Sequence, residues 1–264
     1  MQKNGPIALA FNFLVVAFVL APLVIVCLVA FTPSSTLSIP TTSFSLRWFK
    51  AVFEHADFMQ AFRNSLWLAF SSASIATILG IPAAIAVTRY RFPGRDALNG
   101  LFLSPLMIPH LVLGVAMLRL FALMGTTGSF AWLVLAHVVV ITPYVMRLII
   151  GALVGLDHSI EHAAESLGAN RRTVFLKVTL PMILPGVSGG WLLAFINSFD
   201  ELTMSVFITA PSTVTLPVRM YMYATESVDP MMAAVSALVI ALTAVTMLLL
   251  DRVYGLDRVL VGQK

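Results

Sequence analysis

Long runs of apolar residues, separated by short polar stretches, dominate this chain. Six runs are long enough for a membrane-spanning helix, which needs about 20 mostly apolar residues. They cover residues 7–31, 65–88, 97–118, 129–150, 182–207 and 230–250. Hydrophobic residues make up 59% of the 264 positions and charged residues 11%, whereas soluble domains carry about 25% charged residues. The pattern predicts an all-α membrane protein in which residues 1–264 form a single transmembrane domain with six transmembrane helices.

The basic residues predict the orientation of these helices. If the N-terminus is cytoplasmic, eleven of the sixteen Lys and Arg residues fall on the cytoplasmic side and five on the other. Cytoplasmic loops of membrane proteins carry such an excess, so we expect both termini to be cytoplasmic. The net charge of +4 is then a topology signal, and we expect no nucleic-acid partner. The first apolar run exceeds the 7–15 residues typical of a signal peptide, which favours an uncleaved first span.

One polar segment, EHAAESLGANRRTVFLKVTLPMILPG at residues 161–186, interrupts the apolar pattern between the fourth and fifth spans. Asp157 or Ser159 is a suitable N-cap for a short helix, and Gly168 is suited to end it. Asn170 is a suitable cap for a second helix. These residues predict a helix–Gly–helix elbow on the cytoplasmic side at residues 157–181, hereafter the elbow.

Several side chains of the elbow suggest contact with another surface. Ala163 and Ala164 have almost no side chain and permit close approach, and Glu161 and Glu165 share one helix face because they lie four residues apart. Arg171 sits where a cation is unfavourable, in the first turn of a helix, so it serves membrane topology, lipid phosphates or an acidic partner. These features leave two readings open, an ordinary cytoplasmic loop and a docking element.

The order of Glu161, Ala163, Ala164, Gly168 and Pro181 resembles the "EAA" loop of membrane subunits in bacterial binding-protein-dependent ABC importers. The resemblance implies the type I importer permease fold, with the elbow as a coupling helix that inserts into a cleft on an ATPase subunit. It assigns the coupling role to Glu161, His162, Ala163, Ala164, Glu165, Gly168, Arg171 and Pro181. His162 stands where the family usually has Glu, so the resemblance does not decide whether Glu161 or His162 makes the main ATPase contact.

The same resemblance implies a set of partners in the bacterial cytoplasmic (inner) membrane. They are a second homologous permease subunit, two ATPase subunits, an extracytoplasmic solute-binding protein and membrane lipid. The sequence has no G-x-x-x-x-G-K-[ST] phosphate loop, so we expect this chain to bind no cofactor and ATP with Mg to bind the ATPase. No Ser–His–Asp arrangement or H-E-x-x-H pair is visible. We therefore expect a transport subunit with no catalytic residue and no metal site.

The fifth span carries a second group of candidate residues, at its outer end. Asp200 and Glu201 lie about 27 Å beyond Met182 at ~1.5 Å per residue. Intramembrane carboxylates are costly and often mark the path of an ion or substrate. The alternatives are a structural ion pair with Arg119 or Arg219, or exposure at the outer interface. Earlier in the span, Gly186, Gly190 and Ala194 are spaced four apart, which predicts close packing against a neighbouring helix.

An acidic pair in a pore would attract a cation. The stretch NSFDELTMSVFITAPSTVTLPVRMY resembles the C-type permease of spermidine/putrescine importers, which implies a polyamine or related amine. Importers of iron, thiamine and amino acids carry related sequences, so the solute stays open. The expected substrate path comprises Asp200, Glu201, Asn197, Tyr144, His137 and Tyr223.

The last three of these side chains have competing interpretations. His137 and Tyr144 lie seven residues apart on one helix face, where they either line the path or form an internal hydrogen-bonded pair. Tyr223 either stacks on an amine or anchors the chain at the membrane interface. Two other classes of protein compete with an importer subunit, an intramembrane enzyme and a secondary transporter.

Overall fold

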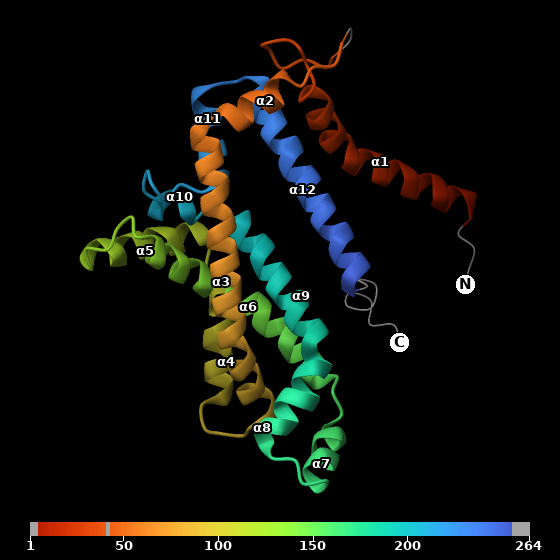
Figure 1. Cartoon of the computed structure of the whole chain (residues 1–264), viewed down its shortest axis with the longest axis vertical. Helices are drawn as coiled ribbons and strands as arrows, with labels where there is room; N and C mark the ends of the chain where they lie inside the picture. The colour runs from red at the N-terminus through yellow and green to blue at the C-terminus, as the bar shows by residue number, and fades with distance from the viewer. Residues whose placement is uncertain (1–4, 41–42, 255–264) are drawn as a thin grey trace. The chain divides into compact units, whose positions relative to one another are not determined.

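The computed structural model describes residues 5–40 and 43–254, and in these residues it contains helices and no strand (Figure 1). The chain divides into two compact units. The first unit comprises Met1–Met59 and Arg219–Leu250, and the second comprises Gln60–Val218 and Asp251–Lys264. The all-α prediction is therefore confirmed for the described residues.

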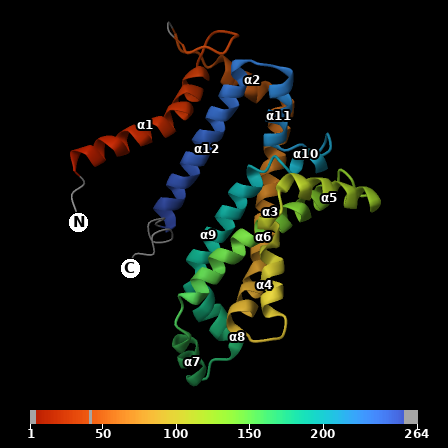
Figure 2. The same ribbon diagram turned by 180° about the vertical axis from the view of Figure 1, so that it is seen from behind.

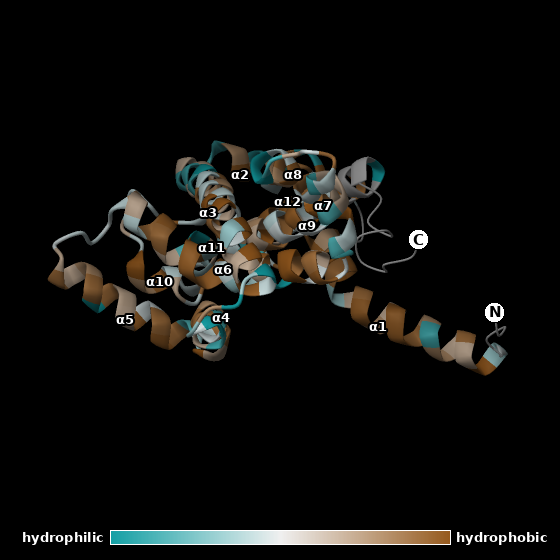
Figure 3. Ribbon diagram, turned by 90° about the horizontal axis from the view of Figure 1, so that it is seen from below, coloured by the Kyte–Doolittle hydropathy of each residue, from teal (hydrophilic) through white to brown (hydrophobic). Residues whose placement is uncertain are grey.

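The first unit contains the apolar helix α1 (Pro6–Val29), the short helix α2 (Arg47–Glu54), most of α11 (Leu216–Glu226) and most of α12 (Pro230–Tyr254). No residue of α1 is buried within the chain, and the helix is hydrophobic along most of its length (Figure 3). A helix that is apolar all round is stable only inside a larger core or a membrane. This composition fits a membrane span.

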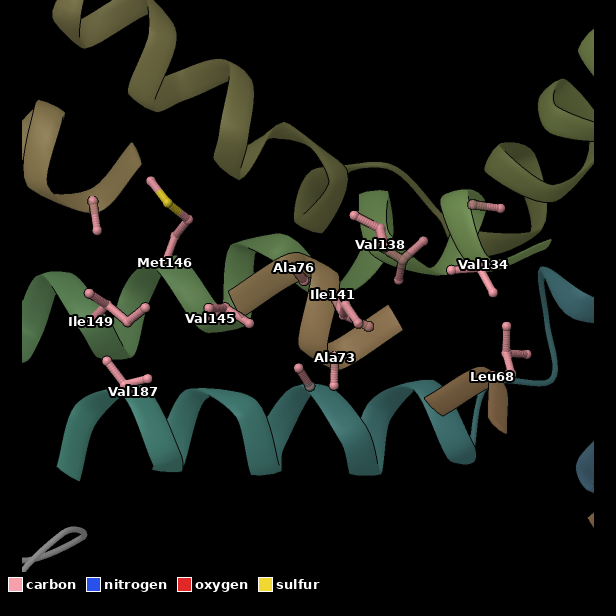
Figure 4. Packing of buried hydrophobic residues seen from close by; sticks show 14 of the residues in the cluster. Leu68, Ala73, Ala76, Val134, Val138, Ile141, Val145, Met146, Ile149 and Val187 are labelled. Carbon is pink, nitrogen blue, oxygen red and sulfur yellow. The ribbon is translucent and has the colours of Figure 1, made fainter. Parts of the chain in front are cut away.

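The second unit holds most of the helices and both candidate regions. Its elements are α3 (Ala56–Arg89), α4 (Arg95–Leu103), η1 (Ser104–Met107), α5 (His110–Leu123), α6 (Phe130–Val154), α7 (His158–Ser166), α8 (Arg171–Val174), the π-helical segment η2 (Phe175–Thr179), α9 (Leu180–Phe199) and α10 (Ser205–Ile208). Helix α6 is the centre of this unit and lies alongside α9 in both ribbon views (Figures 1 and 2). Its side chains Val145, Met146 and Ile149 are fully buried and lie among residues of α3 and α9 (Figure 4).

Small residues bring α9 against α6, as their spacing predicts. A Cβ atom added at Gly186 would lie 2.5 Å from the Cβ of Ala152 and 2.9 Å from the carbonyl oxygen of Leu148. At Gly190 the nearest atoms, in Val145, would be 3.4 Å away. Because lipid tails are as apolar as the side chains, van der Waals packing of this kind stabilises contacts between membrane helices.

Four helices are long and apolar enough to cross a membrane. They are Pro6–Val29, Ala56–Arg89, Phe130–Val154 and Arg171–Phe199. A fifth span would require counting the bent pair Arg95–Met107 and His110–Leu123 as one, and the sixth candidate, Pro230–Thr246, is a shorter apolar helix. The number of six spans and the cytoplasmic termini, which lie outside the described residues, stay predictions.

The third predicted span, residues 97–118, is not one straight helix. The chain bends by 104° between Arg95–Met107 and His110–Leu123. Ile108 is extended, with φ −93° and ψ 127°, and Pro109 is the N-cap of α5. Proline disfavours a helical conformation in the residue before it, which accounts for the break at this point.

The fifth predicted span, residues 182–207, begins and ends earlier in the structure. The helix runs from Arg171 to Phe199 and continues through Pro181 and Pro185. Pro181 lies in the first turn of α9, where the missing N–H is tolerated. The irregularity at this point is the π-helical turn of η2 just before it, a rare conformation that is frequent at functional sites.

Candidate coupling elbow and substrate path

The two short helices of the elbow begin at the predicted caps. The Oδ1 atom of Asp157 accepts a hydrogen bond from the backbone N–H of Ser159 at 2.9 Å, and α7 follows. This hydrogen bond to the backbone lowers the pKa of Asp157 because it stabilises the charged carboxylate. The Oδ1 atom of Asn170 accepts from the N–H of Thr173 at 2.9 Å, and α8 follows. Each cap satisfies a backbone donor that has no partner inside its helix.

Gly168 ends α7 in the way the sequence predicts. Its φ angle is +86°, a left-handed conformation that glycine adopts without penalty. The N–H of Gly168 donates to the carbonyl of Glu165 at 2.9 Å, and the N–H of Ala169 donates to that of Ala164 at 3.1 Å. This pair of bonds is the Schellman motif. No atom lies within 4 Å of the place a Cβ would take at Gly168, so the turn is open to another surface.

Glu161 faces inward and contacts three residues of its own chain. Its Oε1 atom accepts a hydrogen bond from the Thr179 hydroxyl at 2.7 Å. Its Oε2 atom lies 3.5 Å from Nη2 of Arg89 and 3.1 Å from Nδ1 of His158. The side chain of Glu161 is 12% exposed. The elbow is thereby fastened to the last residue of α3 and to the last residue of η2.

His162 faces outward. Its side chain is 68% exposed, and its Nδ1 atom lies 3.5 Å from Oε2 of Glu165, a carboxylate that is also exposed. The ring of His162 stacks on that of His158, with centroids 4.9 Å apart. The other elbow residues, Ala163, Arg171 and Pro181, are exposed, and Ala164 is half-buried. The free surface of α7 therefore presents His162 and Glu165, while Glu161 is turned toward the helices behind it.

At the opposite end of α9, the two adjacent carboxylates have different surroundings. Asp200 is the C-cap of α9 and is exposed. Glu201 is 6% exposed and accepts hydrogen bonds from the N–H groups of Met204 and Ser205, each at 2.9 Å. It also accepts from the hydroxyls of Thr203 at 3.0 Å and Ser205 at 2.9 Å. Glu201 thus holds the turn that leads into α10, and Asp200 is the accessible carboxylate.

The ion-pair partners expected for these carboxylates are not the ones found. The basic side chain that lies against Glu201 is that of His110, whose Nδ1 atom is 3.4 Å from Oε1. Arg219 pairs with Asp57 at 2.8 Å instead. His110 lies at the start of α5, directly after the bend in the chain. This contact could not be predicted from the sequence, because the two residues lie 91 positions apart.

His137 is completely buried and has two serine partners. Its Nδ1 atom is hydrogen-bonded to Ser198 Oγ at 2.9 Å and its Nε2 atom to Ser205 Oγ at 3.0 Å. The alternative of an internal His137–Tyr144 pair is wrong, since serines on α9 and α10 take both ring nitrogens. Tyr144 is half-buried and packs against the core of the second unit. The histidine joins α6, α9 and α10 into one polar network around Glu201.

Asn197 and Tyr223 also engage their own chain. The Asn197 amide donates to the carbonyl of Leu193 at 2.8 Å. The Tyr223 hydroxyl donates to Oδ2 of Asp229 at 2.6 Å, and its ring packs on Phe58 with centroids 5.4 Å apart. Burial and the contact with Asp229 raise the pKa of Tyr223 to about 12. Among the residues that the structure describes, no three His, Cys, Asp or Glu side chains are grouped to hold a metal ion.

Comparison with known proteins places the chain among membrane transport components. Residues 76–255 match the family described as "Binding-protein-dependent transport system inner membrane component". The chain is 36% identical to the spermidine/putrescine transport system permease protein PotC of Haemophilus influenzae, over 89% of this chain and 91% of that one. It is 33% identical to the putrescine transport system permease protein PotI of Escherichia coli, over 84% and 82% of the two chains.

A solved structure supports the fold. A chain of a bacterial ABC transporter involved in the import of the acidic polysaccharide alginate superimposes with a TM-score of 0.73 at 14% identity, covering 96% of this chain and all of that one. At this identity the likeness shows the fold alone, which is that of an ABC importer permease. The family match and the two relatives carry the assignment further. The chain belongs to the inner membrane components of binding-protein-dependent transport systems and is an ABC transporter permease of the bacterial inner membrane.

Proposed function

We propose that this chain forms half of the translocation pathway of an ATP-driven importer for a polyamine or a related small amine. A second homologous permease would supply the other half, and two ATPase subunits would bind ATP and Mg on the cytoplasmic side. An extracytoplasmic solute-binding protein would deliver the solute. This chain would bind no cofactor and catalyse no reaction. Its tasks would be to transmit the movement of the ATPase and to line the path.

One observation carries this proposal. A single helical stretch, Arg171–Phe199, joins the elbow at one end to Asp200 at the other. The α9 part of this stretch packs along α6. A displacement of the elbow would therefore be passed along this helical stretch to the residue that we assign to the path. In alternating access, such a displacement would open the path to one side of the membrane and close it to the other.

The charge of the path supports an amine as the solute. Asp200 is exposed and carries a carboxylate that has no basic partner among the described residues. A carboxylate at the end of a membrane helix attracts cations and disfavours anions. The relatives named for spermidine and putrescine transport agree with this preference. Importers of another solute, such as an amino acid, iron or thiamine, are the alternatives within the class.

Two other classes remain as rivals, an intramembrane enzyme and a secondary transporter. An enzyme would need a reactive constellation, and the polar network around Glu201 is occupied by its own hydrogen bonds. A secondary transporter would move solute without ATP. The requirement for ATP therefore separates the importer from both rivals.

The experiment is uptake by the complete importer reconstituted in lipid vesicles, using a panel of labelled polyamines and amino acids. We expect uptake of a polyamine that requires ATP and the binding protein, and that excess unlabelled amino acid does not reduce. Uptake without ATP, or uptake of an amino acid alone, would overturn the proposal.

The elbow is tested in the same vesicles with Gly168→Asp. Aspartate tolerates the left-handed conformation of this turn, so the variant acts mainly through its new carboxylate, which would occupy the docking surface. We expect the variant to insert but to lose both transport and stimulated ATP hydrolysis. Gly168→Asn is the matched control, because asparagine tolerates this conformation and adds no charge. Normal coupled transport by Gly168→Asp would exclude a coupling role for the elbow.

A further inference from the structure

Glu161 is the most enclosed acidic residue of the elbow, and its contacts do not belong to a docking surface. Only 12% of its side chain is exposed, whereas 43% of the Glu165 side chain on the same helix is exposed. The contacts of Glu161 are Thr179 at 2.7 Å, His158 at 3.1 Å and Arg89 at 3.5 Å. A carboxylate in this position is not available to a partner protein.

Two of the three contacts of Glu161 connect α7 to elements that are distant in the sequence. Arg89 is the last residue of α3, and Thr179 is the last residue of the π-helical segment η2, directly before α9. Both side chains are largely buried, with Thr179 5% and Arg89 14% exposed. Glu161 therefore fastens α7 to two separate membrane helices at their cytoplasmic ends, as the predicted topology has it.

We propose that Glu161, Arg89 and Thr179 form a clamp that converts movement of the elbow into movement of α3 and α9. Glu161 is thus a positioning residue for transport. This inference rests on the proposed coupling role of the elbow and adds the step after docking. His162 and Glu165 face the partner, and Glu161 passes the displacement inward.

The chemistry of the clamp suits this task. A buried ion pair is sensitive to geometry because removing one partner leaves the other charge uncompensated. The Arg89–Glu161 distance of 3.5 Å exceeds the ~2.7–2.9 Å of a charge-assisted hydrogen bond, so these two side chains can move closer together. The hydrogen bond from the Thr179 hydroxyl to Glu161 is shorter, at 2.7 Å. The π-helical turn that ends at Thr179 gives the chain a local irregularity at which α9 can pivot relative to α8.

The clamp predicts a defect that differs from loss of docking. If docking fails, as we expect for Gly168→Asp, stimulated ATP hydrolysis and transport are both lost. If the clamp fails, the ATPase still binds the elbow and hydrolyses ATP, but α3 and α9 do not move with the elbow. The quantity that separates the two defects is the number of solute molecules taken up per ATP hydrolysed.

The test uses the complete importer in vesicles with two clamp variants, Glu161→Gln and Thr179→Val. The second replaces the hydroxyl by a methyl group of the same size and changes no charge. We expect both variants to copurify with the ATPase subunits and to keep binding-protein-stimulated hydrolysis. The number of solute molecules per ATP should fall by about fivefold or more, the scale of a typical coupling between two sites.

A matched control is available on the same segment. Thr173→Val makes the same replacement as Thr179→Val, but it removes a hydroxyl that makes no hydrogen bond to the described residues. This control should keep the wild-type ratio. If Glu161→Gln does not assemble, Thr179→Val decides the matter alone.

Two results would overturn the clamp while leaving the coupling role of the elbow intact. One is a wild-type ratio in Thr179→Val when Gly168→Asp abolishes transport. The other is a parallel loss of hydrolysis and transport in the clamp variants, which would indicate a purely structural role. Failure of the underlying proposal has a different signature, since Gly168→Asp would then transport normally.

Discussion

At the scale of single residues, the structure assigns different roles to Asp200 and Glu201. Asp200 is exposed and Glu201 is enclosed by hydrogen bonds. Because Asp200 holds no contact that the fold needs, Asp200→Asn should leave the thermal stability of the complex unchanged. Uptake of a cationic solute at low concentration should fall by about tenfold, as expected when a steering charge is removed. Initial uptake rates and a melting curve of the purified complex measure both quantities.

Glu201→Gln is the contrasting variant. Glutamine can accept with one oxygen, but its NH₂ group would face the donors Met204 and Ser205. We expect a loss of about 1–3 kcal/mol of stability, the cost of leaving buried polar groups unsatisfied, seen as a lower melting temperature. A variant with normal melting and a selective loss of uptake would instead place Glu201 in the path.

The site residues could be predicted only where their role is local in sequence. The caps at Asp157 and Asn170 and the turn at Gly168 follow from residue type and position, and the structure has all three. The roles of Arg89, Thr179 and Ser198 could not be predicted, because each depends on a partner far along the chain. The direction in which Glu161 and His162 point also depends on the packing of α7 against η2.

At the scale of helices, the contact between α9 and α6 is so close that it requires small residues. A methyl group at Gly186 would overlap Ala152 and the Leu148 carbonyl, so Gly186→Ala should destabilise the protein by about 1–3 kcal/mol through overpacking. At Gly190 an added Cβ would lie 3.4 Å from the nearest atoms of Val145, an ordinary contact distance. Gly190→Ala should therefore cost less. Gly151→Ala meets no atom within 4 Å and should be neutral or stabilising, since alanine favours helices over glycine by about 1 kcal/mol.

Melting temperatures of the three purified variants give the order of these effects. Equal stability of Gly186→Ala and Gly151→Ala would mean that α6 and α9 do not pack as closely as the structure has them. Uptake assays of the same variants add a second measure, because a separated α9 should also transmit movement poorly.

Helix ends were harder to predict than helix existence. The apolar pattern locates α3, α6 and α9, because long apolar runs have few alternatives in a membrane. The apolar pattern does not predict the bend between η1 and α5, because the segments on both sides of the bend are apolar. Only Pro109 indicates the break. The predicted span also extends past the end of α9 at Phe199, although Asp200 and Glu201 interrupt the apolar run there. The hydrogen bonds of Glu201 fold the chain into α10 at this point.

At the scale of the whole molecule, the bent pair Arg95–Met107 and His110–Leu123 decides the topology. If the pair crosses the membrane, the loop that holds Thr127 is outside and Ser159 of the elbow is inside. If the pair returns to the same side, Thr127 is inside and Ser159 emerges outside, where no ATPase could reach it. The excess of basic residues favours the first arrangement, and a working elbow requires it.

Single cysteines test this prediction in a background that lacks Cys27, the only native cysteine. In spheroplasts, a membrane-impermeant maleimide should label Ser35→Cys and Thr127→Cys directly, and Ser159→Cys only after the membrane is permeabilised. All three positions are exposed in the structure, so a missing signal would reflect the side of the membrane rather than burial. Direct labelling of Ser159→Cys together with protection of Thr127→Cys would mean that the bent pair does not cross. The elbow would then lie outside the cell, where the ATPase cannot bind it, and this result would exclude both the coupling role of the elbow and the clamp at Glu161.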